Sequence, residues 1–147
     1  SDPDVHAMLS RDTDCRLCAR EAAAVNEWME SDKDFHIIRD HPYHATEIMG
    51  GMWGVKNGLL SNMKEMIDEY EKGDFWQVDQ NFLREHVYPQ VQDSVFVHDP
   101  FFEKKPFPVE RDYNGKVRFI GEVFDENEKY NPKDIEILAQ AEGVNLL

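Results

Sequence analysis

The chain has 147 residues, of which 41% are hydrophobic and 12% aromatic, so it is long enough for one domain with a sizeable core and too apolar to be disordered. Its net charge of −14 argues against a nucleic-acid partner, because few cations are available to replace the counterions of a polyanion. No apolar run reaches the roughly 20 residues that cross a bilayer, and residues 1–4 show neither the basic start nor the apolar stretch of a signal peptide.

The hydrophobic pattern of the first half predicts alternating strands and helices. A mostly apolar run at 5–9 predicts a strand, and the alanine-rich segment 18–30 predicts a helix. Residues 35–38 predict a second short strand. The apolar segment 48–55 contains three glycines, which indicates a buried stretch whose backbone is closely approached by another group.

The middle of the chain predicts two helices. An apolar stripe at helical spacing predicts a helix over 57–72, with Gly73 as its C-cap. Residues 75–88 predict another helix, which Pro89 is expected to end because proline cannot continue it.

The remaining elements complete an α/β alternation. Strands are predicted at 94–98 and 116–120, and an Asn-Gly turn is predicted within 112–115. A closing helix over 132–141 starts with Asn131 as its N-cap and proline at its first position. The sequence shows no repeat and no linker, so we expect one domain.

Two carboxylates, Asp12 and Asp14, directly follow the first predicted strand. Side chains two positions apart in an extended segment point the same way, and ligands bind at the carboxyl ends of strands in open α/β sheets. The pair can therefore hold one divalent cation, and paired oxygen anions suit Mg²⁺ or Mn²⁺. The alternative is a solvated turn, which is common for Asp-x-Asp in an acidic protein.

Cys15 and Cys18 form a single C-x-x-C. A structural zinc site needs two more ligands, and a redox pair needs a thiolate, which the neighbouring Asp12 and Asp14 disfavour. We favour two incidental reduced thiols over a zinc site or a redox pair, and such thiols are typical of a reducing compartment.

Three further clusters could carry chemistry. Residues 39–44 combine an arginine, a carboxylate and two imidazoles after a predicted strand, which indicates a polar pocket. Asp79 and Gln80 precede an apolar pair on a predicted helix. His98 ends a predicted strand and can be a third metal ligand, and one of the two lysines that follow it, Lys104 or Lys105, can hold phosphate. The ordinary alternatives are a solvated loop, an amphipathic helix and a structural histidine.

The order of these pieces resembles the metal-dependent nucleotide-sugar glycosyltransferases of the GT-A fold, especially the retaining enzymes related to glycogenin and bacterial galactosyltransferases. Asp-x-Asp after a strand, a glycine-rich apolar segment, Asp-Gln before an apolar pair, and His followed by Lys-Pro-aromatic occur in that order. Arg39-Asp40-His41-Pro42 and Gly50-Gly51-Met52-Trp53-Gly54 also look like a set in uncharacterised glycosyltransferase-like proteins of polysaccharide loci. The resemblance runs from about residue 4 to residue 107.

The resemblance implies a fold and a set of site residues. The fold is α/β, with a mixed sheet and flanking helices like the C-terminal part of a GT-A enzyme. The implied cofactor is Mn²⁺ or Mg²⁺, held by Asp12, Asp14 and His98, and the implied catalytic pair is Asp79 and Gln80. The implied substrate-binding residues are polar side chains near these motifs: Arg11, Arg39, Asp40, His41 and Lys105.

The implied activity is transfer of a sugar from a nucleotide-sugar donor to a glycan acceptor in polysaccharide synthesis, in the cytoplasm. The alternative is a non-catalytic metal- or sugar-binding module. Only eleven residues precede Asp12, whereas the family places a nucleotide-binding half of roughly a hundred residues there. We therefore expect residues 1–147 to be one domain that lacks this half, and we expect the sheet edge left exposed to pair with a second copy in a homodimer.

Overall fold

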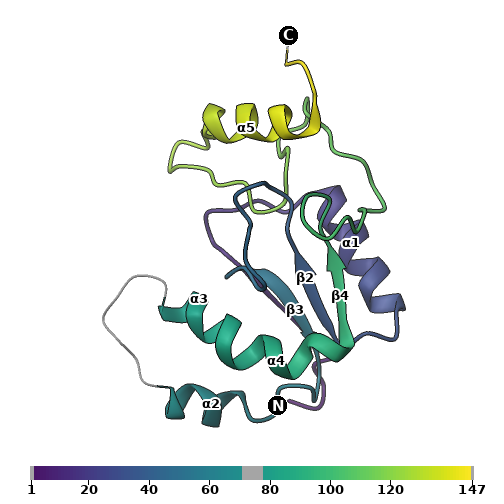
Figure 1. Cartoon of the computed structure of the whole chain (residues 1–147), viewed down its shortest axis with the longest axis vertical. Coiled ribbons are helices and arrows are strands. Elements are labelled where there is room, and N and C mark those ends of the chain that lie inside the picture. Colours follow the sequence, from purple (N-terminus) through teal and green to yellow (C-terminus); the bar gives the residue numbers. More distant parts are fainter. Residues whose placement is uncertain (1, 71–77, 147) are drawn as a thin grey trace.

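The computed structural model describes residues 2–70 and 78–146. Its four strands form one sheet in the order β1-β3-β2-β4, with the bounds β1 Ala7–Arg11, β2 Phe35–Ile38, β3 Met52–Lys56 and β4 Val95–His98. Strand β3 is antiparallel to both of its neighbours, whereas β2 and β4 are parallel. The fold is mixed α/β, with a mixed sheet and flanking helices (Figure 1), and this confirms the fold class that the sequence predicts.

Different helices cover the two faces of the sheet, because successive side chains of a strand point to opposite faces. Helix α1 (Ala19–Glu30) packs on one face, where Trp28 stacks on His36 at 5.1 Å between ring centroids. The other face is covered by α3 (Val78–Phe82), a π-helical turn (Leu83–Val87) and α4 (Tyr88–Val91). The core on this second face consists of aromatic and aliphatic side chains: Phe35, Ile37, Ile48, Trp53, Phe82, Leu83, Val87 and Val91.

Gly54 allows α1 to lie close to the sheet. A Cβ at this position would lie 2.8 Å from the Leu9 side chain and 3.0 Å from the Trp28 ring. A larger residue would therefore push the helix or the edge strand away. The predicted close approach to the glycine-rich segment is confirmed here.

The helix that precedes β4 continues past Pro89, so the prediction that Pro89 ends it is wrong; its predicted start at 75–77 lies outside the described residues. Proline lacks an N–H and its ring collides with the carbonyl four residues earlier in a regular helix. Here the preceding turn is π-helical, with the Tyr88 N–H donating to the Leu83 carbonyl. The wider turn accommodates the proline, and a 3₁₀ turn (Gln92–Ser94) then leads into β4.

Two other predicted elements differ from the structure. Within residues 57–70 the helix predicted over 57–72 is confined to α2 (Met63–Glu69), and residues 71–72 and the predicted cap, Gly73, lie outside the described residues. The strand predicted at 116–120 is a loop. Its Ile120 N–H donates to the Asp40 carboxylate at 2.9 Å, so a buried side chain takes the place of a neighbouring strand.

The closing helix, α5 (Pro132–Glu142), lies beyond the end of the sheet (Figure 1) and agrees with the predicted helix over 132–141. Its predicted cap is confirmed, since the Asn131 side chain accepts the Lys133 N–H at 3.1 Å. The helix packs through Ile135 and Leu138 on Phe119. None of the helices in residues 2–70 and 78–146 has the length and apolar character that a membrane crossing requires.

Candidate functional site

The carboxyl ends of β1, β2 and β4 meet at one edge of the sheet, because these three strands run in the same direction. The amino end of the antiparallel β3 lies at the same edge, with Met52 opposite Arg11. Asp12, Gly51, Arg39 and Asp99 are the residues next to these strand ends. This is the part of an α/β sheet where ligands bind.

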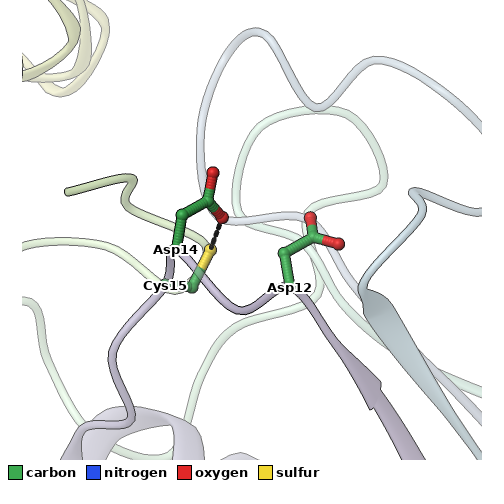
Figure 2. A group of neighbouring side chains, drawn as sticks. All are labelled: Asp12, Asp14 and Cys15. Atoms are coloured by element: carbon green, nitrogen blue, oxygen red, sulfur yellow. Dashed lines mark hydrogen bonds between the residues drawn. The ribbon is translucent and has the colours of Figure 1, made fainter. Parts of the chain in front are cut away.

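Asp12, Asp14 and Cys15 form a group at this edge, and their ligand-type atoms all lie within 4.8 Å of one another. Figure 2 shows the three side chains leaving the chain just after β1. The segment is a turn and not the predicted extended stretch, because the Cys15 N–H donates to the Asp12 carbonyl at 3.3 Å. The turn brings the two carboxylates together all the same.

Gly51 provides the surface on which the Asp12 carboxylate rests. A Cβ at Gly51 would lie 2.5–2.6 Å from the carboxyl atoms of Asp12, and the residue has φ +71°, a conformation that favours glycine. Any other residue would displace the carboxylate. The glycine-rich segment and the Asp-x-Asp motif, both noted in the sequence, are therefore parts of one site.

Helix α3 adds Asp79 and Gln80 to this site. The Gln80 side chain accepts the Gly50 N–H at 2.9 Å, directly beside Gly51. Burial raises the pKa of Asp12, and the negative charges of Asp14 and Asp79 raise it further. The structure thus brings together four predicted site residues from two distant segments, and a bound cation would relieve the repulsion among the three carboxylates.

The donor set favours a hard cation. Burial and the charges of Asp14 and Asp12 raise the pKa of the Cys15 thiol to about 12, so the thiol stays protonated and the carboxylates are the available ligands. Cys18 is free, like Cys15, and packs beside Ile38 in a small apolar cluster. In the described residues no second group of three metal-ligating side chains exists.

His98 is not part of this group. Strands β1 and β4 form opposite edges of the sheet with two strands between them, which separates their ends by roughly 14 Å. Both ring nitrogens of His98 are engaged elsewhere: Nδ1 lies 2.8 Å from His36 Nε2, and Nε2 lies 3.0 Å from the Glu27 carboxylate. The metal site predicted from Asp12, Asp14 and His98 is therefore not assembled.

His36 and Glu27, which bond the two ring nitrogens of His98, are not among the residues that the sequence predicts for the site. The Glu27 carboxylate can only accept a hydrogen bond, so His98 Nε2 carries the proton and donates it. In a neutral imidazole the other nitrogen, His98 Nδ1, then accepts from His36 Nε2. This assignment leaves His36 Nδ1 buried without a hydrogen-bond partner. Burial lowers the pKa of His36 to about 2, and burial also lowers the pKa of His98. A histidine between two apolar residues of a buried strand is the sequence feature that marks this pair.

Arg39 ties three segments together inside the fold. Its guanidinium donates to the carbonyls of Thr46 and Glu47 at 2.6 Å each, to the Asp99 carboxylate at 3.0 Å, and to Glu103. Only 5% of the residue is exposed. These contacts engage its guanidinium within the fold, and its role in binding substrate stays a prediction.

Asp40 and His41 are buried in the same way. Asp40 accepts a bidentate pair of hydrogen bonds from Arg20 and further ones from Arg111 and from the Ile120 N–H. His41 Nδ1 accepts the Tyr43 N–H at 3.0 Å, so Nε2 carries the proton and donates to the Asp134 carbonyl at 2.9 Å. Within the polar pocket predicted at 39–44, Arg39, Asp40 and His41 belong to a buried hydrogen-bond network, whereas Tyr43 is exposed.

Arg11 and Lys105 are the remaining predicted substrate-binding residues. Arg11 joins β1 to α1 through an ion pair with Glu21 and donates to the Trp53 carbonyl at 2.9 Å. Lys105 is exposed and lines a shallow hollow beside β4, on the opposite edge of the sheet from Asp12. Neither contacts the carboxylate group in the structure.

Comparisons of the chain with protein-family models, with curated proteins and with solved structures give no match.

Proposed function

We propose that the chain belongs to a metal-dependent glycosyltransferase, which transfers a sugar from a nucleotide-sugar donor to a glycan acceptor in polysaccharide synthesis. The observation that carries the proposal is the meeting of Asp12 and Asp14, at the end of β1, with Asp79 and Gln80 of α3 around Gly51. The Asp-x-Asp, glycine-rich and Asp-Gln motifs of the sequence resemblance thus lie in one place, whereas the His98 motif and residues 39–42 lie elsewhere. We place the protein in the cytoplasm, in keeping with its two free thiols.

The residues present fit a hard divalent cation. Asp12 and Asp14 would hold Mn²⁺ or Mg²⁺, since these ions take carboxylate oxygens and are completed by substrate phosphates. The bound ion would supply Lewis-acid stabilisation of the leaving diphosphate. Asp79, which is exposed on α3, would stabilise the positive charge that develops on the sugar in an oxocarbenium-like transition state.

The first test is a Mn²⁺ titration in which the free ion is counted by electron paramagnetic resonance, with and without uridine diphosphate. We expect Asp12→Ala and Asp14→Ala each to weaken binding at least about tenfold, which corresponds to roughly 1.4 kcal/mol, because each removes a direct ligand. Asp68→Ala, at an exposed position of α2, is the control and should bind like wild type. Wild-type affinity in Asp14→Ala would contradict the proposed site.

A second candidate function, a non-catalytic metal- or sugar-binding module, is favoured by one observation. The side chains of Arg39, Asp40 and His41 bond within the fold, so the arginine and imidazole of this motif are already engaged and do not contact the carboxylates. Release of nucleoside diphosphate from nucleotide sugars in the presence of Mn²⁺ separates the two functions. Turnover supports the enzyme, and binding of Mn²⁺ without turnover supports the module.

We also propose that two copies pair through β1, which is an edge strand with Met8 and Leu9 45% and 43% exposed. The charge of −14 opposes association, but it is screened beyond about 8 Å at ~0.15 M salt. Sedimentation equilibrium should show a dimer at high micromolar concentration and a monomer for Met8→Lys, since lysine blocks edge pairing. Leu146→Lys, at a similarly exposed position, should remain dimeric, and a strictly monomeric wild type would refute the pairing.

A further inference from the structure

The carboxamide of Gln80 makes all its hydrogen bonds within the chain. Its Oε1 accepts the Gly50 N–H at 2.9 Å, and its Nε2 donates to the Ile48 carbonyl and, at 3.5 Å, to Thr46 Oγ1. A carboxamide has two N–H donors, and these two contacts occupy both. Gln80 therefore has no free donor for a substrate.

These three contacts fall on one loop, residues 46–50, which leads into Gly51. Gly51 is the residue on which the Asp12 carboxylate rests. On the Gln80 side the packing is of ordinary tightness, since a Cβ at Gly50 would lie in van der Waals contact with Gln80 Oε1, at 3.5 Å. Gln80 thus joins α3 to the loop that seats Asp12.

The backbone N–H of Gln80 donates to Asp79 Oδ1 at 2.9 Å, so the orientation of the Asp79 carboxylate follows the placement of this turn, which the Gln80 carboxamide ties to the loop. The apolar side of the helix formed by α3 and the following π-helical turn packs into the core, where Phe82 and Leu83 are each 8% exposed. The apolar side therefore fixes where the helix lies, and Gln80 fixes how its first turn meets the carboxylates.

We propose that Gln80 is a positioning residue, whose carboxamide fastens the start of α3 to the 46–50 loop and thereby holds Asp79 beside Asp12 and Asp14. It acts on the site through Asp79 and not by touching a substrate, which differs from the catalytic role that the sequence resemblance implies. The proposal rests on the proposed function only in treating the three carboxylates as a cation site.

A double-mutant cycle on Mn²⁺ affinity tests the dependence on Asp79. We expect Gln80→Met and Asp79→Asn each to weaken binding about tenfold, as loss of supporting contacts around a metal does. The double variant should be no weaker than Asp79→Asn, because Gln80 then has nothing left to position. Gln90→Met is the matched control, since Gln90 follows on the same helical run and bonds the His86 carbonyl at 3.0 Å; it should bind like wild type.

Hydrogen exchange of the Gly50 amide, followed by NMR without metal, gives a second readout. We expect faster exchange in Gln80→Met and wild-type exchange in Asp79→Asn and Gln90→Met. If wild type binds no Mn²⁺, the proposed function fails and this readout alone decides the inference. Additive losses of Mn²⁺ affinity in the double-mutant cycle would overturn the positioning role of Gln80, and so would unchanged exchange of the Gly50 amide in Gln80→Met. If Gln80→Met does not fold, Gln80→Ala replaces it in both measurements.

Discussion

Asp40→Ala is expected to destabilise the protein by about 3–5 kcal/mol, because removing one partner from a buried ion cluster leaves the remaining charges uncompensated. Asp40 is fully buried and accepts from Arg20 and Arg111, whose side chains are 10% and 4% exposed. The Ile120 N–H loses its acceptor as well. The corresponding fall in Tm is roughly 10–15 °C, and urea unfolding followed by tryptophan fluorescence would measure it.

Two variants make this result specific. Asp40→Asn keeps the size but turns an N–H donor towards the donors of Arg20 and Arg111, so it should also destabilise strongly. Asp68→Ala removes an exposed carboxylate from α2 and should change stability by less than about 0.5 kcal/mol. A loss below ~1 kcal/mol in Asp40→Ala would mean that both arginines find other partners, and the structural role of Asp40 would be abandoned.

The elements that the sequence predicts well are those whose pattern is local. Residues 18–30 and 132–141 carry helical periodicity with recognisable ends, and they correspond to α1 and α5 within one residue. Residues 116–120 alternate polar and apolar side chains as a strand does, but they form a loop. The reason is that their backbone N–H groups bond side chains such as Asp40 and not a neighbouring strand. Local pattern does not reveal which distant group satisfies a backbone N–H.

The candidate site divides in the same way. Asp12 and Asp14 lie two positions apart in the chain, and Gly51 belongs to a glycine-rich segment that indicates a close approach, so the sequence predicts these parts of the site. The exclusion of His98 depends on strand order, which places β1 and β4 at opposite edges. Hydrophobic periodicity gives the faces of a strand but not its neighbours, so the sequence does not distinguish a strand-end histidine beside the carboxylates from one on the far edge of the sheet.

The burial of residues 39–41 was hidden for a related reason. Arg111, which bonds Asp40, lies 71 residues further along the chain. A dense run of charged and imidazole side chains is typical both of a pocket and of a buried network. The partners that decide between the two come from α1 and from the segment before α5, and no spacing within residues 39–44 indicates them.

Acidification from pH 6.5 to pH 5 is expected to remove about 3 kcal/mol of stability through His36 and His44 together. Burial lowers the pKa of His36 to about 2 and of His44 to about 4, whereas each imidazole titrates near 6.5 when exposed. The unfolded chain therefore binds protons in this range and the folded chain does not, so this contribution to stability is complete only at about one pH unit or more above 6.5 and falls as the pH decreases. Each histidine contributes a slope of about 1.4 kcal/mol per pH unit.

Urea unfolding at intervals between pH 7.5 and 5 would measure this slope, and single variants would assign it. His36→Phe and His44→Phe should each flatten the slope by about 1.4 kcal/mol per pH unit, since each removes one proton taken up on unfolding. His6→Gln, which removes an exposed imidazole, should keep the wild-type slope. His98, whose pKa burial also lowers, adds in the same direction despite its bond to Glu27. A free energy of unfolding that does not change between pH 7 and 5 would contradict this prediction. It would mean that the imidazoles become protonated while the chain stays folded, which requires water to reach the buried His36–His98 pair.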